Sequence, residues 1–151
     1  MILAIDPGTT QSAFCWYERG ATPKAGILSN DEMISVITDC GYPTLNVVIE
    51  MIASYGMAVG KEVFETVRWV GRFQQAHIYP EQVNFVYRKE VKMHLCHSMK
   101  AKDANIRQAL IDKIGPQGTK KAPGPTYGLA KDMWAALAVA VTFDELKRAR
   151  A

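Results

Sequence analysis

Two short apolar runs that each end in an acidic residue constrain the fold of this chain more than any other feature. Residues 2–5 read Ile-Leu-Ala-Ile and are followed by Asp6, and residues 47–49 read Val-Val-Ile and are followed by Glu50. A β-branched triplet of this kind is typical of a strand that is buried on both faces. The first run is followed by Pro7-Gly8, which predicts a strand and then a tight turn.

The rest of the chain alternates between strand-like and helix-like patterns. Further strands are expected at residues 13–17, 26–28 and 83–87, and helices at about 30–38, 61–76, 90–96, 104–114 and 131–148. Asn30 or Asp31 is a candidate N-cap for the first of these helices, and Asp103 for the fourth. Residues 115–128 contain four Gly and three Pro and are expected to form a loop. This order predicts a single α/β domain over residues 1–151 with a mixed sheet.

Composition excludes several classes of protein. No apolar run reaches the roughly 18–20 residues that a membrane helix needs. The first residues carry no cationic region and reach Asp6 after four apolar residues, so we expect no signal peptide. The three cysteines form no Cys-x-x-Cys pair, which favours reduced thiols, a cytoplasmic protein and no structural zinc site.

Charge is unevenly distributed along the chain. Residues 1–75 carry 5 Lys and Arg against 8 Asp and Glu, whereas residues 76–151 carry 13 against 7. Nine of the basic residues lie between Arg88 and Lys121. This asymmetry is compatible with a polyanionic partner such as a nucleic acid, and equally with an ordinary solvated basic face.

Three acids are candidates for a metal site. Asp6 and Glu50 each follow a strand, and ligand sites in α/β sheets lie beyond the carboxyl ends of strands. If the two strands are parallel neighbours, the two carboxylates converge. Asp132 is expected on an otherwise apolar helical stripe with Ala136, Val139 and Phe143, where an acid needs a partner or a metal. The alternatives are that Asp6 and Glu50 begin polar turns and that Asp132 complements a helix dipole.

Three converging carboxylates would suit Mg²⁺, with Mn²⁺ as a substitute. Two such ions about 3.5–4 Å apart can activate a water molecule and stabilise the leaving oxygen of a phosphodiester. The three histidines are scattered, and no Ser-His-Asp or Cys-His arrangement has a recognisable motif around it.

These segments together resemble a known family. Residues 2–10, residues 48–50 and residues 131–140 are similar, in order and spacing, to the first acidic strand, the second acidic strand and the C-terminal helix of RuvC-type Holliday-junction resolvases. Residues 102–110 look most like phage-borne or prophage-borne members. The resemblance covers nearly the whole chain. It implies a ribonuclease H-like fold, a metal-dependent endonuclease acting on branched DNA such as a four-way junction, a homodimer, and the cytoplasm of a bacterium or an infected host.

The resemblance also implies roles for individual residues. Asp6, Glu50 and Asp132 match metal-binding, catalytic carboxylates, and Lys92 matches a catalytic lysine near the scissile phosphate. The helix after Glu50 is similar to the helix that forms the dimer interface of the family, with Phe64, Val67 and Phe73 as candidate contacts. The remaining candidates are DNA-binding residues: Tyr55, Arg88, Lys89, Lys100, Lys102, Lys120 and Lys121.

Two departures from the family pattern stand out. Ala135 occupies the position at which the family usually has another acid, three residues after Asp132. A fourth ligand is therefore missing, supplied from elsewhere or removed by substitution, and the matching flanks favour substitution. The family also places an aromatic residue just after the second acid, where this chain has Met51-Ile52-Ala53, and Tyr55 is a candidate replacement.

Two other functions remain open on the sequence. Residues 5–10 also resemble the phosphate loop of ATP-binding proteins of the actin and sugar-kinase superfamily, in which backbone amides hold phosphates. That architecture requires a second domain and a second phosphate loop, and this chain has no second Asp-x-Gly-Thr segment. Ala135 motivates the other alternative, a module that binds branched DNA without cleaving it.

Overall fold

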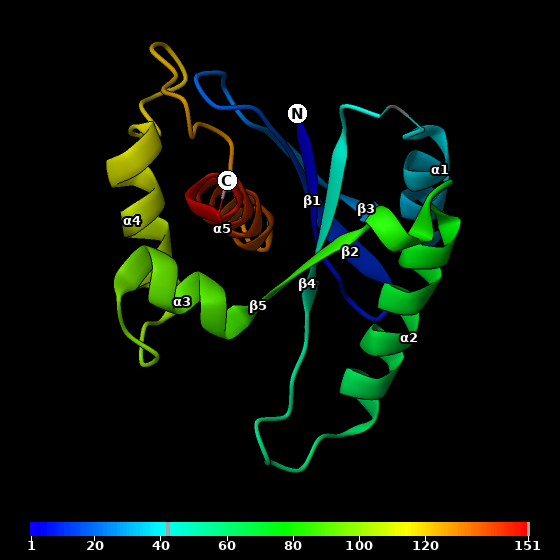
Figure 1. The fold of residues 1–151 in the computed structure, drawn as a ribbon. Helices are drawn as coiled ribbons and strands as arrows, with labels where there is room; N and C mark the ends of the chain where they lie inside the picture. Colours follow the sequence, from blue (N-terminus) through cyan, green and yellow to red (C-terminus); the bar gives the residue numbers. More distant parts are fainter. Residues whose placement is uncertain (42, 151) are drawn as a thin grey trace.

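A five-stranded mixed sheet forms the centre of the molecule (Figure 1). The computed structural model describes residues 1–41 and 43–150, except for the side chains of residues 148 and 149. The strand order is β3-β2-β1-β4-β5. The strands are β1 (Ile2–Asp6), β2 (Gln11–Tyr17), β3 (Lys24–Ser29), β4 (Asn46–Met51) and β5 (Asn84–Tyr87). The first three strands are antiparallel neighbours, while β4 runs parallel to both β1 and β5.

Helices cover both faces of this sheet, as Figure 1 shows. The crossovers between parallel strands contain α1 (Asn30–Asp39) and α2 (Lys61–Ala76), which lie together on one face. The other face is covered by α5 (Met133–Arg150), with α3 (Arg88–Cys96) and α4 (Asp103–Ile114) packed on its outer side. Helices on both faces bury the middle of β4, which is why Val47, Val48 and Ile49 are apolar in succession.

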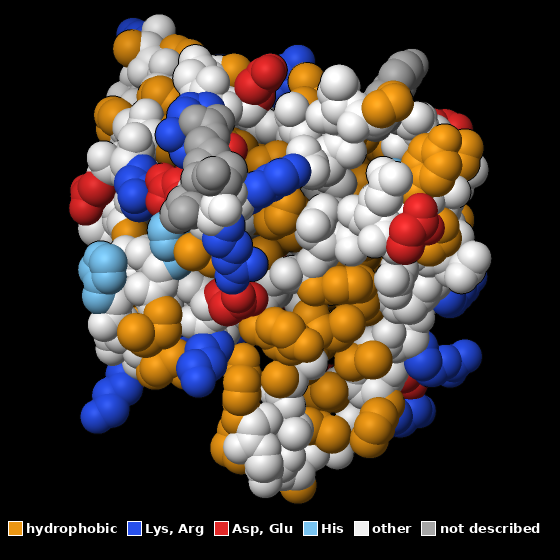
Figure 2. Space-filling view, in the orientation of Figure 1, with side chains coloured by type: hydrophobic (Ala, Val, Ile, Leu, Met, Phe, Trp, Pro, Cys, Tyr) orange, Lys and Arg blue, Asp and Glu red, His pale blue; other side chains and the backbone are white. Residues whose placement is uncertain are grey.

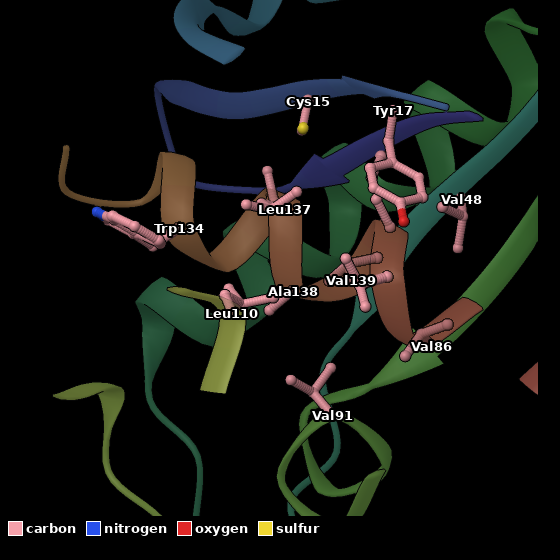
Figure 3. Close-up of a cluster of buried hydrophobic side chains, with 14 of the residues drawn as sticks. Cys15, Tyr17, Val48, Val86, Val91, Leu110, Trp134, Leu137, Ala138 and Val139 are labelled. Atoms are coloured by element: carbon pink, nitrogen blue, oxygen red, sulfur yellow. The ribbon is translucent and has the colours of Figure 1, made fainter. Parts of the chain in front are cut away.

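The larger hydrophobic cluster lies between the sheet and α5, and Figure 3 shows part of it. Ala136, Ala138 and Ala140 are buried in α5, and small side chains of this kind allow the helix to pack close to its neighbours. In Figure 3 Leu137 points toward Cys15 of β2, whereas Ala138 lies beside Leu110 of α4, because α3 and α4 cover the side of α5 that faces away from the strands. The helix is therefore buried around its whole middle rather than along the single stripe that the sequence predicted.

Polar contacts tie α3 and α4 to α5. Glu145 of α5 accepts hydrogen bonds from the Lys113 ammonium of α4 at 3.3 Å and forms an ion pair with His94 of α3. This three-helix contact lies beside the apolar cluster and holds α3 and α4 against one helix. The contact is made from the last turns of α3 and α4.

Most element boundaries agree with the sequence prediction to within about two residues, but the N-caps of two helices differ from it. The N-cap of α1 is Ser29, whose hydroxyl accepts from the Glu32 amide at 3.2 Å while the Glu32 carboxylate accepts from the Ser29 amide. The predicted caps Asn30 and Asp31 are therefore wrong. Asp103 is the first residue of α4 and not its N-cap, which is Lys102. None of the helices formed by the described residues combines the length and the hydrophobicity that a bilayer-spanning segment requires.

Candidate functional site

Asp6 and Glu50 lie next to each other at one end of the sheet. Strands β1 and β4 are parallel, and Ile5 pairs with Ile49, so the two following residues emerge at the same edge. The Glu50 side chain is only 12% exposed. The convergence that the sequence predicted, on the condition that the strands were parallel neighbours, is therefore present in the fold.

Asp132 reaches the same edge from a different position than the sequence predicted. The residue lies just before α5, and its carbonyl accepts from the Ala136 amide at 3.0 Å in the first turn of that helix. It is exposed, so the expectation of an acid on the buried stripe is wrong, although Ala136 and Val139 of that stripe are buried. Asp132 nevertheless lines a cavity of about 160 Å³ together with Asp6, Glu50 and Ala135.

The electrostatics of this cavity favour a cation. Burial, followed by repulsion from Glu50 and then Asp132, raises the pKa of Asp6 to about 8. Burial also raises the pKa of Glu50 to about 7, and Asp103 and Asp132 add to the rise. Oε2 of Glu50 is buried and has no hydrogen-bond partner. A buried carboxylate oxygen without a donor is costly, and a metal ion would satisfy it.

The donor set thus fits a divalent cation that prefers oxygen ligands. Within the part of the chain that the structure describes, however, no three acidic, His or Cys side chains are gathered closely enough to form a ready metal cage. The acids would have to draw together around an ion, and exposed Asp132, at the start of a helix, is the ligand with most freedom to move.

Two charged residues that the sequence did not assign to this centre also line the cavity. Asp103, at the start of α4, forms an ion pair with Arg88 and raises the pKa of Glu50. Lys131 lines the cavity and has a left-handed backbone with φ of 51°, which is uncommon for a residue other than glycine. The only sequence signals for these residues were the first-turn position of Asp103 and the proximity of Lys131 to Asp132.

Arg88, which the sequence predicts to bind DNA, lies at this acidic centre. Its guanidinium lines the cavity, with Nη1 3.8 Å from Oε2 of Glu50. Lys92 is one helical turn further along α3 and is half-buried. Its ammonium is close enough to lower the pKa of Glu50, opposing the effect of burial. Helix α3 therefore contributes two cations to the centre, in addition to Lys131.

The other predicted DNA-binding residues lie outside the cavity and are exposed. Lys89 is on α3, Lys100 precedes α4, and Lys102 caps α4. Lys120 and Lys121 occupy the tip of a short hairpin in which Gly118 pairs with Pro123. This hairpin is closed by hydrogen bonds from the Thr119 amide to the Ala122 carbonyl and from the Gly124 amide to the Gln117 carbonyl. Backbone hydrogen bonds therefore hold the segment that carries the two lysines in a defined hairpin conformation.

Tyr55 lies in the connection between β4 and α2 and does not line the acidic cavity. Its side chain is 55% exposed and its backbone is left-handed, as is that of the following Gly56. Met57 in the same connection is exposed as well. Figure 2 shows hydrophobic side chains gathered over this connection and the start of α2, at the lower part of that face.

Helix α2 presents an exposed apolar strip beyond this connection. Phe64 is 62% exposed and Val67 is 39% exposed, and both lie on the side of the helix that faces away from the sheet. Gly71 continues the same side and has no other group within 4 Å of the position of a Cβ atom. Phe73, the third expected contact, is fully buried in the core, so that part of the prediction is wrong.

Comparisons with solved structures identify the fold. The structure of Thermus thermophilus RuvC matches with a TM-score of 0.66 and 16% identity, covering 97% of this chain and 95% of that chain. T. thermophilus RuvC in complex with a Holliday junction substrate matches with a TM-score of 0.67 and 17% identity, covering 97% and 94%. The likeness establishes the ribonuclease H-like fold that the sequence predicted. No protein-family model and no curated protein sequence matches the chain.

Proposed function

We propose that this chain is a divalent-metal-dependent endonuclease that resolves four-way DNA junctions by hydrolysis of phosphodiester bonds. The observation that carries the proposal is the pair of acids Asp6 and Glu50, which lie largely buried at the ends of adjacent strands. Oε2 of Glu50 is buried there without a hydrogen-bond partner. The fold it shares with RuvC supports the same function, because one of the matching RuvC structures is a complex with a Holliday junction substrate.

Asp6, Glu50 and Asp132 would hold the metal, which we propose to be Mg²⁺ with Mn²⁺ as a substitute. When bound, such an ion supplies an activated water and neutralises charge on the phosphate. The chain itself contributes the position of the ligands: Asp6 and Glu50 are fixed by the sheet. Lys92, half-buried near Glu50, is placed to stabilise negative charge that develops on the scissile phosphate.

The DNA would lie across the edge of the sheet that carries these acids. Lys89 on α3, Lys100 before α4 and Lys102 at the N-cap of α4 are exposed, and the Lys120-Lys121 hairpin offers a contact to a junction arm. Phosphate contacts of this kind supply affinity without reading base sequence. Tyr55 is exposed at the tip of a projecting connection, where an aromatic ring could stack against an unpaired base at the crossover.

We further propose that the active form is a homodimer. Two symmetric cuts across a four-way junction require two active sites related by a two-fold axis. The exposed strip of α2, formed by Phe64, Val67 and Gly71, is suited to self-association. The apolar side chains would lose water on contact, and Gly71 lets two copies of the helix approach closely.

A second candidate function follows from Ala135. This residue lines the acidic cavity without offering a ligand, so a chain with an incomplete metal site would bind junctions and cleave nothing. The ATP-binding alternative gains no support, because the Gly8 amide in the proposed phosphate loop already donates to the Ser12 hydroxyl at 3.1 Å.

One assay separates these functions. Junction, fork, flap and duplex DNA are incubated with the unaltered chain and with Ala135→Asp, in Mg²⁺ and in Mn²⁺. A junction nuclease cleaves the four-way junction with paired, symmetric cuts in at least one metal, and EDTA abolishes the reaction. Cleavage by Ala135→Asp alone would assign the unaltered chain to the binding function. Absence of cleavage and of junction-specific binding by both proteins would refute both candidates.

A further inference from the structure

Arg88 occupies the middle of the acidic centre because of where β5 ends. Strand β5 is parallel to β4, and Glu50 pairs with Val86, so the chain beyond Tyr87 emerges at the same edge as the acids. Arg88 is the first residue of α3, and its side chain turns into the cavity rather than away from it. The parallel pairing therefore places a guanidinium beside Glu50 by construction of the sheet.

The Arg88 guanidinium bridges two of the acids. Nη1 lies 3.8 Å from Oε2 of Glu50, and Nη2 forms an ion pair with the carboxylate of Asp103. The Arg88 side chain is 30% exposed, whereas Asp103 on the rim is 90% exposed. The guanidinium thus connects the buried floor of the cavity to its rim, and Asp103 anchors it from the solvent side.

A guanidinium in this position acts as a permanent positive charge. Arginine stays protonated at every physiological pH, and its planar fork suits two carboxylates at once. Among the charges that act on Asp6 and Glu50, Arg88 is the largest that opposes burial and repulsion between the acids. The cavity thus holds a fixed cation beside Glu50 before any metal binds.

Ala135 reduces the number of side chains in this cavity that could bind a metal ion. It lines the cavity together with Arg88 and Asp103 and contributes no oxygen. A two-ion centre needs enough carboxylates to hold both ions, and here one acid is missing while Asp103 is engaged by Arg88.

We propose that Arg88 takes the place of one divalent ion, so that the chain binds a single metal ion through Asp6, Glu50 and Asp132. Arg88 and Asp103 together fill the remainder of the centre. This inference rests on the proposed function, because it presupposes that the acids hold a metal. It makes Arg88 a residue that sets metal stoichiometry and not a contact to the DNA backbone alone.

Calorimetric titration with Mn²⁺, together with electron paramagnetic resonance of bound and free Mn²⁺, tests this without any cleavage assay. We expect the unaltered chain to bind one ion. Arg88→Gln should bind two, because Asp103 becomes free to act as a ligand. Its first ion should bind at least about tenfold more tightly, because a nearby positive charge has been removed.

Three further variants complete the design. Arg88→Lys keeps the charge and should bind one ion. The double variant Arg88→Gln with Asp103→Asn should return to one ion, because the ligand that Arg88 released is absent. Lys24→Gln removes a positive charge from β3, on the far side of β2 and β1 from β4, and should bind one ion with unaltered affinity. Circular dichroism establishes that each variant is folded.

The outcomes separate this inference from the proposed function. Two ions bound by the unaltered chain would overturn the role of Arg88 and leave the metal centre intact, whether or not Arg88→Gln folds. One ion of unchanged affinity in folded Arg88→Gln would overturn the role as well. No binding of Mn²⁺ by the unaltered chain would overturn the metal centre and, with it, this inference.

Discussion

Asp6 and Glu50 lie at the same end of two adjacent parallel strands, because Ile5 and Ile49 pair in register directly before them. The sheet therefore brings together two acids that are 44 positions apart in the chain. Their proximity and burial raise the pKa of Asp6 to about 8 and, chiefly through burial, that of Glu50 to about 7. Two carboxyl groups held this way are poorly compensated by the protein alone, which supports the proposal that they bind a cation.

Removing the charge of Asp6 should abolish cleavage and spare binding. Asp6→Asn keeps the shape of the side chain but loses the charge that would hold the metal. We expect no detectable junction cleavage in Mg²⁺, in a background that cleaves, with junction affinity within a few-fold of the parent. Gel-based cleavage and binding assays measure the two effects. Asp39→Asn, on the exposed end of α1, is the matched control. Turnover retained by Asp6→Asn in Mg²⁺ would refute the metal assignment.

The metal-free chain should lose stability as pH rises. The pKa of Asp6 rises on folding from 3.8 to about 8, and that of Glu50 from 4.5 to about 7. Between about pH 4 and pH 8 the folded state therefore retains protons that the unfolded state has released. The stabilisation is complete below about pH 4, is lost progressively as pH rises above 4, and is absent above about pH 8. The contribution is on the order of a few kcal/mol.

Thermal unfolding in EDTA at pH 5 and pH 8 measures this effect as a difference between variants. Asp6→Asn should lose less stability over the same interval than the parent, because Asn has no charge to develop. Mg²⁺ should raise the Tm of the parent more at pH 8 than at pH 5, because metal binding requires deprotonated ligands. Identical pH profiles for the parent and Asp6→Asn would contradict the assignment of Asp6 as a strongly shifted acid.

Disruption of the α2 strip should produce a folded monomer. Phe64 is 62% exposed in the isolated chain, so Phe64→Glu places a charge where the second copy would pack and leaves the core unchanged. Light scattering should give a dimer mass for the parent and a monomer mass for the variant at micromolar concentration. Met93→Glu changes an exposed apolar residue on α3 and should remain dimeric. A monomer mass for the parent with and without junction DNA would exclude the dimer.

Lys120 and Lys121 should contribute to the affinity for DNA and not to the cleavage rate. Replacing Lys120 and Lys121 by Gln removes two charges from the tip of a formed hairpin. Each lost phosphate contact should flatten the dependence of log affinity on log salt by about 0.9 on duplex arms. Binding titrations between low and moderate salt measure the slope, and the single-turnover rate at saturating enzyme should be unchanged. An unaltered slope would show that this hairpin does not touch the DNA.

Lys92 should contribute more to the cleavage rate than to the affinity for junction DNA. Its ammonium is half-buried on α3 and acts on Glu50, which places it beside the proposed metal site. Loss of one group that stabilises developing charge typically lowers a rate by about a hundredfold or more. Lys92→Ala should therefore cut slowly at saturating enzyme in a cleavage-competent background, while its junction affinity changes little. Cleavage by Lys92→Ala at the parental rate would show that Lys92 has no catalytic role.

Local patterns in the sequence were sufficient for most of the fold. The apolar runs before Asp6 and Glu50 predicted two strands of the mixed sheet, and the periodicity of residues 61–76 predicted α2 at its observed bounds. Strand and helix periodicities depend on neighbours two to four positions away, so a single sequence contains them. Helix starts were less predictable. Ser29 and not Asn30 caps α1. The Asn30 side chain is buried instead, where it accepts a hydrogen bond from the Ser12 hydroxyl and donates one to the Gly8 carbonyl.

What the sequence by itself determined was the order of the elements, the α/β class and the three candidate acids, each visible as a polar residue that interrupts or ends an apolar pattern. Only the tertiary structure decided which charges face one another. Asp103 and Arg88 carry no local signature of a site, because a charged residue in the first turn of a helix is ordinary on any protein surface. They enter the centre because β5 lies parallel to β4 and because α4 packs against α3. Contacts between residues far apart in the chain depend on strand pairing and helix packing, which no local pattern encodes.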